Sequence, residues 1–203
     1  IHGIPSRKRI LREGDIVKID TGATYRGYVG DSARTIPVGN VSEQAKKLIR
    51  VTRDSFFAGA EQVKVGNRLG DVGHAIAALV TENGGSDTSL LVINRKAAGI
   101  VSVRLSTPRW GRYVGHGIGT DMHESPDVPN YGTPGRGIRL CAGMTVAIEP
   151  MVNTGTYDVR EMPDGWTVKT ADGAVYQTCT VVVSGEDDPA EIKVTGIALN
   201  KEL

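Results

Sequence analysis

Five acidic or imidazole side chains stand out for the chemistry that they could perform together: Asp20, Asp31, His116, His123 and Glu149. Glu149 lies within the apolar stretch VAIEPMV at residues 146–152. An ionised carboxylate in an apolar strand must be paired, hydrogen-bonded or metal-bound, because its isolated burial costs several kcal/mol. Three carboxylates with one or two imidazoles would suit a shared site for two divalent transition-metal ions.

Each of these residues also has an ordinary structural interpretation. Asp20 and Asp31 could each belong to a turn, which is the usual place of an aspartate. His116, between two glycines, could fill a small space in the core, and His123, next to an acidic residue, could be a solvated loop residue. His74, on an expected helix, is interpreted as structural. A purely structural role is least convincing for Glu149, because its neighbours are apolar on both sides.

Composition places few limits on function but excludes several classes of protein. The 203 residues, 39% hydrophobic and 23% charged with a net charge of +1, are typical of one globular domain. Cys141 and Cys179 give no disulfide framework, which favours a reducing compartment. No apolar run reaches the ~20 residues that a membrane span needs. We therefore expect a cytoplasmic protein without a membrane or a specific nucleic-acid partner.

The elements that must position these residues can be predicted from pattern. Alternating residues at 15–25 and 28–36 predict two strands joined by a tight turn. Helices are expected from the N-cap Ser42 to about residue 60 and over residues 68–82. Later strands are expected at 113–119, at 144–150, within the stretch that follows up to residue 166, and at 175–183. A Pro/Gly-rich loop is expected at 125–137, and residues 85–112 have no assignment. Such an order favours the α+β class.

Six segments in this order resemble the type I methionine aminopeptidases. They are HGIP (2–5), GDIVKID (14–20), GDSART (30–35), GHGIG with HESP (115–119 and 123–126), GMTVAIEPM (143–151) and DGWTV (164–168). The resemblance implies the pita-bread fold, in which two pseudo-symmetric α+β halves surround a central antiparallel sheet and a dinuclear metal site. It also implies one catalytic domain over residues 1–203, without the N-terminal segment of the family. The first residue, Ile1, likewise indicates a processed or truncated chain.

The metal ligands that the resemblance implies are Asp20, Asp31, His116 and Glu149. Asp20 would bind one ion through both oxygens, and Asp31 would bridge the two ions. His116 and Glu149 would complete the shell of the other ion. Because Co, Mn, Fe and Zn all accept this mixture of ligands, the physiological metal stays open.

The resemblance also implies roles toward the substrate. Glu149 would take a proton from the water between the ions, and His123 would hydrogen-bond the scissile carbonyl group. His2 would contact the peptide near its new N-terminus, while Trp166 and Met122 would form walls of the methionine pocket. The substrates would be N-terminal peptides of nascent proteins, met near the ribosome, and the enzyme would be a monomer.

Two features of the sequence depart from the family. The family carries a bridging glutamate on its last strand, whereas this chain has Thr178 there, or Gln177 if the alignment shifts by one residue. Neither supplies a carboxylate, so the second metal site is expected to be weak. Residues 85–112 are also longer than the usual connection.

Two functions follow as hypotheses. The first is an aminopeptidase that removes the initiator methionine through metal-activated water. The second is a catalytically impaired or non-enzymatic pita-bread protein, and the missing bridging glutamate is the reason to consider it. A nearer alternative, a proline-directed aminopeptidase or a creatinase-like enzyme, is disfavoured by the HGIP and DGWTV segments.

Overall fold

The computed structural model describes residues 2–84, 102–103, 113–154, 159–173, 176–178, 180–185 and 192–194. Most of the unassigned stretch 85–112 therefore lies outside the described residues. The elements in chain order are β1 (Ile16–Tyr25), β2 (Tyr28–Pro37), α1 (Glu43–Ala60), α2 (Leu69–Gly84), β3 (Ser102–Val103), β4 (Gly115–Gly117), β5 (Glu124–Val128), β6 (Thr145–Ile148), β7 (Met151–Asn153), β8 (Val159–Glu161), β9 (Val168–Thr170), β10 (Tyr176–Thr178), β11 (Thr180–Gly185) and β12 (Ile192–Val194).

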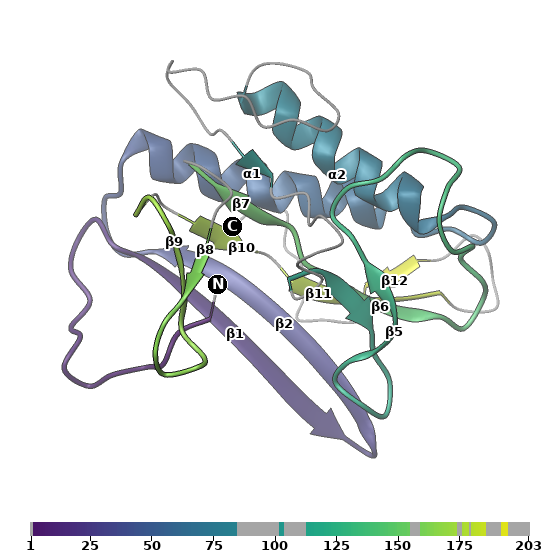
Figure 1. Cartoon of the computed structure of the whole chain (residues 1–203), viewed down its shortest axis with the longest axis horizontal. Coiled ribbons are helices and arrows are strands. Elements are labelled where there is room, and N and C mark those ends of the chain that lie inside the picture. Colours follow the sequence, from purple (N-terminus) through teal and green to yellow (C-terminus); the bar gives the residue numbers. More distant parts are fainter. Residues whose placement is uncertain are drawn as a thin grey trace.

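The largest sheet joins both ends of the chain. Its order is β1-β2-β11-β6-β4-β5, with β12 paired to β11, and all of its pairings are antiparallel. Figure 1 shows the long β1–β2 hairpin on one side of this sheet and β5 on the other. Two smaller sheets have the orders β10-β7-β3 and β8-β9. Helices together with antiparallel sheets confirm the predicted α+β class.

The hairpin follows the sequence prediction closely. Ten cross-strand pairs run from Ile16↔Pro37 to Tyr25↔Tyr28. Arg26 and Gly27 between the strands have φ values of 50° and 85°. Positive φ at both central residues belongs to the two-residue turns that match the right-handed twist of a hairpin.

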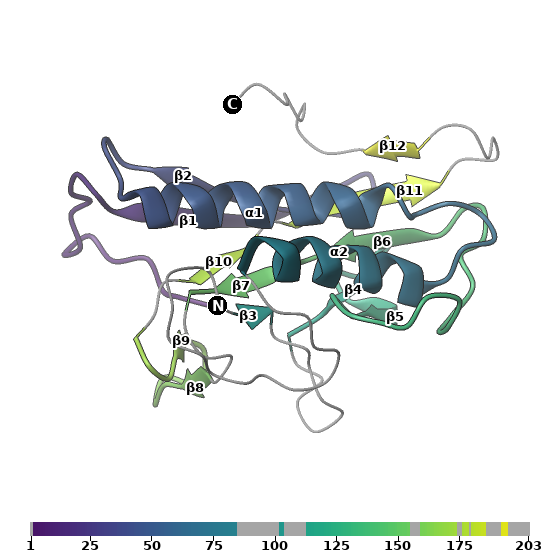
Figure 2. The same ribbon diagram turned by 90° about the horizontal axis from the view of Figure 1, so that it is seen from above.

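Both predicted helices are present, and they lie side by side on one side of the strands (Figure 2). Ser42 is the N-cap of α1, as predicted, since its side chain accepts a hydrogen bond from the Ala45 amide at 3.2 Å. Apolar residues of the helices, loops and strands form one buried cluster: Phe56, Ala60, Val63, Leu69, Val72, Ile76, Val128, Leu140, Val146 and Ile148. This cluster fixes the helices against the sheet that carries the candidate site.

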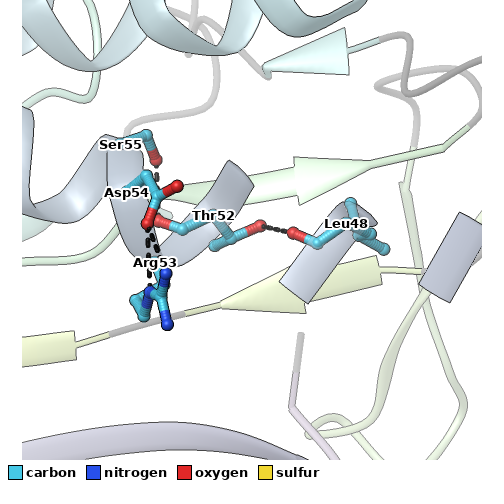
Figure 3. Close-up of polar contacts among 5 residues, drawn as sticks. All are labelled: Leu48, Thr52, Arg53, Asp54 and Ser55. Atoms are coloured by element: carbon cyan, nitrogen blue, oxygen red, sulfur yellow. Dashed lines mark hydrogen bonds and ion pairs between the residues drawn. The ribbon is translucent and has the colours of Figure 1, made fainter. Parts of the chain in front are cut away.

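Helix α1 also buries two hydroxyl groups without leaving them unpaired. The Thr52 hydroxyl donates to the Leu48 carbonyl oxygen and the Ser55 hydroxyl to the Thr52 carbonyl oxygen, both at 2.8 Å (Figure 3). Local bonds of this kind remove most of the cost of burying a hydroxyl group. Arg53 and Asp54, also drawn there, pair at 2.9 Å.

Several predicted boundaries were wrong. The loop expected from residue 125 begins with strand β5, which contains Pro126 and pairs with β4. Because β5 ends the strand order of its sheet, a proline without an amide hydrogen is tolerated there. The strand expected at 144–150 stops at Ile148, before the Glu149-Pro150 pair. The last expected strand, 175–183, is described as β10 and β11, which lie on either side of residue 179, outside the described residues.

No helix in the described part of the chain is both long enough and apolar enough to cross a membrane.

Candidate metal centre

Three side chains from separate parts of the largest sheet meet at one point. Asp31 lies on β2, His116 on β4, and Glu149 directly after β6. The Nε2 atom of His116 is 2.9 Å from Oε1 of Glu149 and 3.6 Å from Oδ2 of Asp31. One nitrogen or oxygen atom from each residue lies within 4.8 Å of the others, a spacing at which one metal ion could contact all three.

The surroundings of His116 favour the tautomer that binds a metal. Its side chain is 8% exposed, and its Nδ1 atom lies 2.8 Å from the Gly117 carbonyl oxygen, which can only accept a hydrogen bond. Nδ1 is therefore assigned as the protonated nitrogen, which leaves the lone pair of Nε2 facing two carboxylates. Within the described residues, Nε2 is buried without an aligned hydrogen-bond partner. A cation between Nε2 and the carboxylates would satisfy all three groups.

The pKa of His116 reflects the same negative surroundings. Burial lowers the pKa, but the interactions with Asp31, Glu149 and the Gly117 carbonyl group outweigh it and raise the pKa to about 10. Without a metal ion the imidazole therefore carries a second proton, on Nε2, and a cation that binds there would replace this proton.

Asp20 joins the group from the neighbouring strand. It pairs with Ala33, and Gly22 pairs with Asp31, so the two aspartates project from the same face of the hairpin. Burial, followed by the nearby charges of Asp31 and Glu149, raises the pKa of Asp20 to about 6. The structure thus brings together Asp31, His116 and Glu149 and places Asp20 beside Asp31. These four residues, which the sequence suggested as metal ligands, are called the metal group below. Their chemistry fits a borderline divalent cation, which takes imidazole and carboxylate ligands together.

Two members of the metal group, His116 and Glu149, line a cleft of about 400 Å³. Its lining residues are His2, Tyr113, Val114, Gly115, His116, His123, Glu124, Ser125, Asp127, Glu149 and Met151. His123 lies beside the metal group without belonging to it, since its ring centroid is 4.4 Å from that of His116 at an interplanar angle of 61°. This position suits a hydrogen-bond donor to a molecule in the cleft.

His2 lies among aromatic rings at the cleft. Its ring centroid is 4.8 Å from that of Trp166 and 5.9 Å from that of Tyr113. The Val168 amide also donates to the His2 carbonyl oxygen at 3.1 Å, which ties the N-terminal segment to β9. Burial lowers the pKa of His2, so its neutral form is favoured.

Trp166 is held by a turn rather than by burial. The Asp164 carboxylate accepts hydrogen bonds from the Trp166 and Thr167 amides at 3.0 and 2.8 Å and from the Thr167 hydroxyl at 2.6 Å. These bonds, chiefly those to Thr167, hold the pKa of Asp164 below its usual value. The Trp166 side chain remains 55% exposed and touches the cleft through His2.

The other predicted residues lie less directly at the cleft. The Met122 methyl group is placed against Gly22 of β1, so a larger residue at position 22 would require this side chain to shift. His74 is exposed on α2. The backbone of Gln177 and Thr178 pairs with Val152 and Met151 of β7, but the side chains of both residues lie outside the described part of the structure.

Two residues at the site gave no signal in the sequence. Tyr113, the first residue of the strand expected at 113–119, lines the cleft. Asn130, in the loop after β5, donates from Nδ2 to the backbone carbonyl oxygen of Glu149 at 2.6 Å. An asparagine in a segment rich in proline and glycine is typical of a turn, and only the fold shows what Asn130 contacts.

Comparison with known proteins decides the family. The sequence profile of Metallopeptidase family M24 matches residues 1–195. The chain belongs to metallopeptidase family M24. Its curated relatives include the methionine aminopeptidase of Clostridium acetobutylicum, 49% identical over 95% of this chain and 68% of the relative. Methionine aminopeptidase 1 of Bacillus subtilis is 44% identical over 85% of this chain and 60% of the relative. This chain therefore spans between 60% and 68% of the length of these two relatives.

Solved structures agree with this assignment to M24. The methionine aminopeptidase of Thermotoga maritima has a TM-score of 0.78 and 40% identity over 94% of this chain and 68% of its own. The prolidase of Pyrococcus furiosus, at 23% identity and a TM-score of 0.63 over 97% of this chain and 45% of its own, supports the fold alone. The resemblance to methionine aminopeptidases and the pita-bread fold are thus confirmed. As an M24 member, the chain belongs to a family of hydrolases that use divalent metal ions.

Proposed function

We propose that this chain is the catalytic domain of an aminopeptidase that removes the initiator methionine from nascent proteins. The observation that carries the proposal is the convergence of Asp31, His116 and Glu149 at a cleft that His123 and His2 also line. Relatives named methionine aminopeptidase, up to 49% identical, favour this reaction over others of the same fold.

Asp20, Asp31, His116 and Glu149 would hold two divalent ions, with Co, Mn, Fe and Zn all compatible with the ligands. Asp31 lies between Asp20 and the His116–Glu149 pair, which supports its role as the shared ligand. The second ion would be held weakly, since Gln177 and Thr178 offer no carboxylate in place of the bridging glutamate of the family. When bound, such ions make water a good nucleophile at neutral pH by lowering its pKa.

Residues of the chain itself would bind the peptide and accept the proton of the attacking water. The Glu149 carboxylate, whose side chain is 20% exposed, would accept the proton of the attacking water. His123 would donate a hydrogen bond to the scissile carbonyl oxygen, whose negative charge grows only in the transition state. His2 would contact the peptide near its new N-terminus, and Trp166 and Met122 would limit the methionine pocket. The proposed enzyme is a cytoplasmic, single-domain monomer that acts on chains near the ribosome.

Hydrolysis of a short Met-Gly peptide tests the proposal. The purified protein, loaded with Co²⁺ or Mn²⁺, should release free methionine and should lose this activity on chelation. The same peptide with an acetylated N-terminus is the matched control, because an exopeptidase needs a free amine. Methionine release without metal, or equal cleavage of both peptides, would contradict the proposal. Metal binding without hydrolysis would favour the rival, a non-catalytic pita-bread protein.

A further inference from the structure

The strand that leads to Glu149 ends one residue before it. β6 ends at Ile148, which pairs with Val181, and β7 begins at Met151 in another sheet. Pro150 has no amide hydrogen with which to continue a ladder. Glu149 and Pro150 therefore lie between two described ladders, β6–β11 and β7–β10, and the described strand pairs include neither residue.

Asn130 holds the backbone of this stretch with a side-chain hydrogen bond. Its side chain is buried, with 3% exposed, and its Nδ2 atom donates to the Glu149 carbonyl oxygen at 2.6 Å. In the part of the chain that the structure describes, the Asn130 Oδ1 atom has no hydrogen-bond partner. The bond to Glu149 is therefore the contact that orients this amide. By holding the carbonyl group, it restricts the ψ angle of Glu149 and hence the direction of its side chain.

Asn130 is itself held through a loop that packs on α2. The Asp71 carboxylate, in the first turn of this helix, accepts hydrogen bonds from the Arg68 and Gly135 amides at 2.7 and 2.6 Å. Gly73 of α2 lies so close to the carbonyl groups of Pro129 and Tyr131, on either side of Asn130, that a Cβ atom would collide with them. The helix thus fixes the loop from both sides of the asparagine.

We propose that Asn130 is a positioning residue, which sets the Glu149 carboxylate in the metal group by holding the Glu149 carbonyl group from a loop anchored on α2. This inference rests on the proposed metal site. Partners of this kind, one step away from the metal, typically change metal affinity about 10–100-fold when they are removed. Asn130 would therefore control metal affinity and coordination without touching the ion.

Titration with Co²⁺ tests this inference, because its visible absorption reports the coordination of the ion directly. Asn130→Ala removes the donor, and Asn130→Asp removes it while keeping the size of the side chain. Asn153→Ala is the matched control, since Asn153 is also an asparagine with 3% exposed, but it lies on β7, which pairs with β10 and β3. The metal-free Tm, and its rise when Co²⁺ is added, are measured for all variants, so that a weakly folded variant still gives a reading.

Both Asn130 variants should weaken the tighter Co²⁺ site by about 10–100-fold and change its absorption spectrum. Asn153→Ala should lower the metal-free Tm but keep the affinity and spectrum of the parent. Parent-like Co²⁺ binding by the Asn130 variants, or equal losses in the Asn153 control, would overturn the inference and leave the metal site in place. A parent protein that binds no Co²⁺ would overturn the proposed metal site and this inference together.

Discussion

The metal group and the aromatic side of the cleft differ in how the fold holds them. Asp31 and His116 lie on paired strands of one sheet, and their side chains are 11% and 8% exposed. Trp166 lies in a turn, is 55% exposed, and contacts His2 through its ring. The first region is fixed by strand ladders and a buried core, whereas the second depends on a few local bonds.

This difference suggests a division of labour. Groups that hold ions and move protons need fixed geometry, because a small displacement of a ligand or base costs much of its effect. In the proposed enzyme, a wall that would receive an unbranched, adaptable methionine side chain can tolerate more movement. Changes in the metal group should therefore act on turnover and metal binding, and changes near the substrate should act on turnover with metal binding intact.

The largest effect is expected from Glu149→Gln. The amide keeps the shape of the side chain but cannot accept the proton, so the turnover of a Met-Gly peptide should fall by about 10²–10⁴-fold. Steady-state kinetics at saturating metal measure this loss. If the Glu149→Gln variant kept the turnover of the parent, Glu149 would not be the proton acceptor.

His123→Ala should have the next largest effect and should separate the two regions. Loss of a donor to the developing negative charge should lower turnover about 10²–10³-fold. Because His123 lies beside the metal group and not in it, the metal content of the purified variant should equal that of the parent. Metal loss in this variant would instead make His123 a ligand.

Restoring a carboxylate to the last strand should have a smaller effect. Thr178→Glu, or Gln177→Glu if the shifted alignment holds, should tighten the weaker ion about tenfold, which corresponds to about 1.4 kcal/mol. Calorimetric metal titration of the parent and both variants measures it, with the variant at the other position serving as the control. Two equally tight sites in the parent would show that another residue already replaces the glutamate.

The smallest effect is expected from Asp20→Asn in the metal-free protein. The pKa of Asp20 is raised from 3.8 to about 6 in the folded state, so between these pH values the folded chain binds more protons than the unfolded chain. The free energy of unfolding should therefore fall as the pH rises through this interval, and Asp20→Asn should reduce the fall. Denaturant unfolding in the presence of a chelator measures both slopes. Equal slopes would show that Asp20 does not titrate in this way.

The sequence predicted those parts of the fold that depend on local pattern. The β1–β2 hairpin, the N-cap Ser42 and the two helices follow from alternation, capping and periodicity, and each is present. Strand β5 was missed because Pro126 and its polar neighbours are typical of a loop, while the edge of the sheet that tolerates them is a tertiary feature.

The site was predicted in part for the same reason. Asp31, His116 and Glu149 could be chosen from their residue types and the family segments, and the structure brings them together. Asn130 could not be chosen, since its contact with Glu149 depends on how a loop docks on α2. Residue type thus identifies groups that perform chemistry more readily than groups that hold them in place.

Anomalous X-ray diffraction from crystals of the protein soaked in Zn²⁺ tests the central claim most directly. The account predicts an anomalous peak ~2.0–2.1 Å from Nε2 of His116 and ~2.0–2.2 Å from carboxylate oxygens of Asp31 and Glu149. A weaker second peak is expected on the Asp20 side of Asp31. Protein that binds Zn²⁺ in solution but shows no peak among these side chains, or shows its strongest peak elsewhere, would contradict the account.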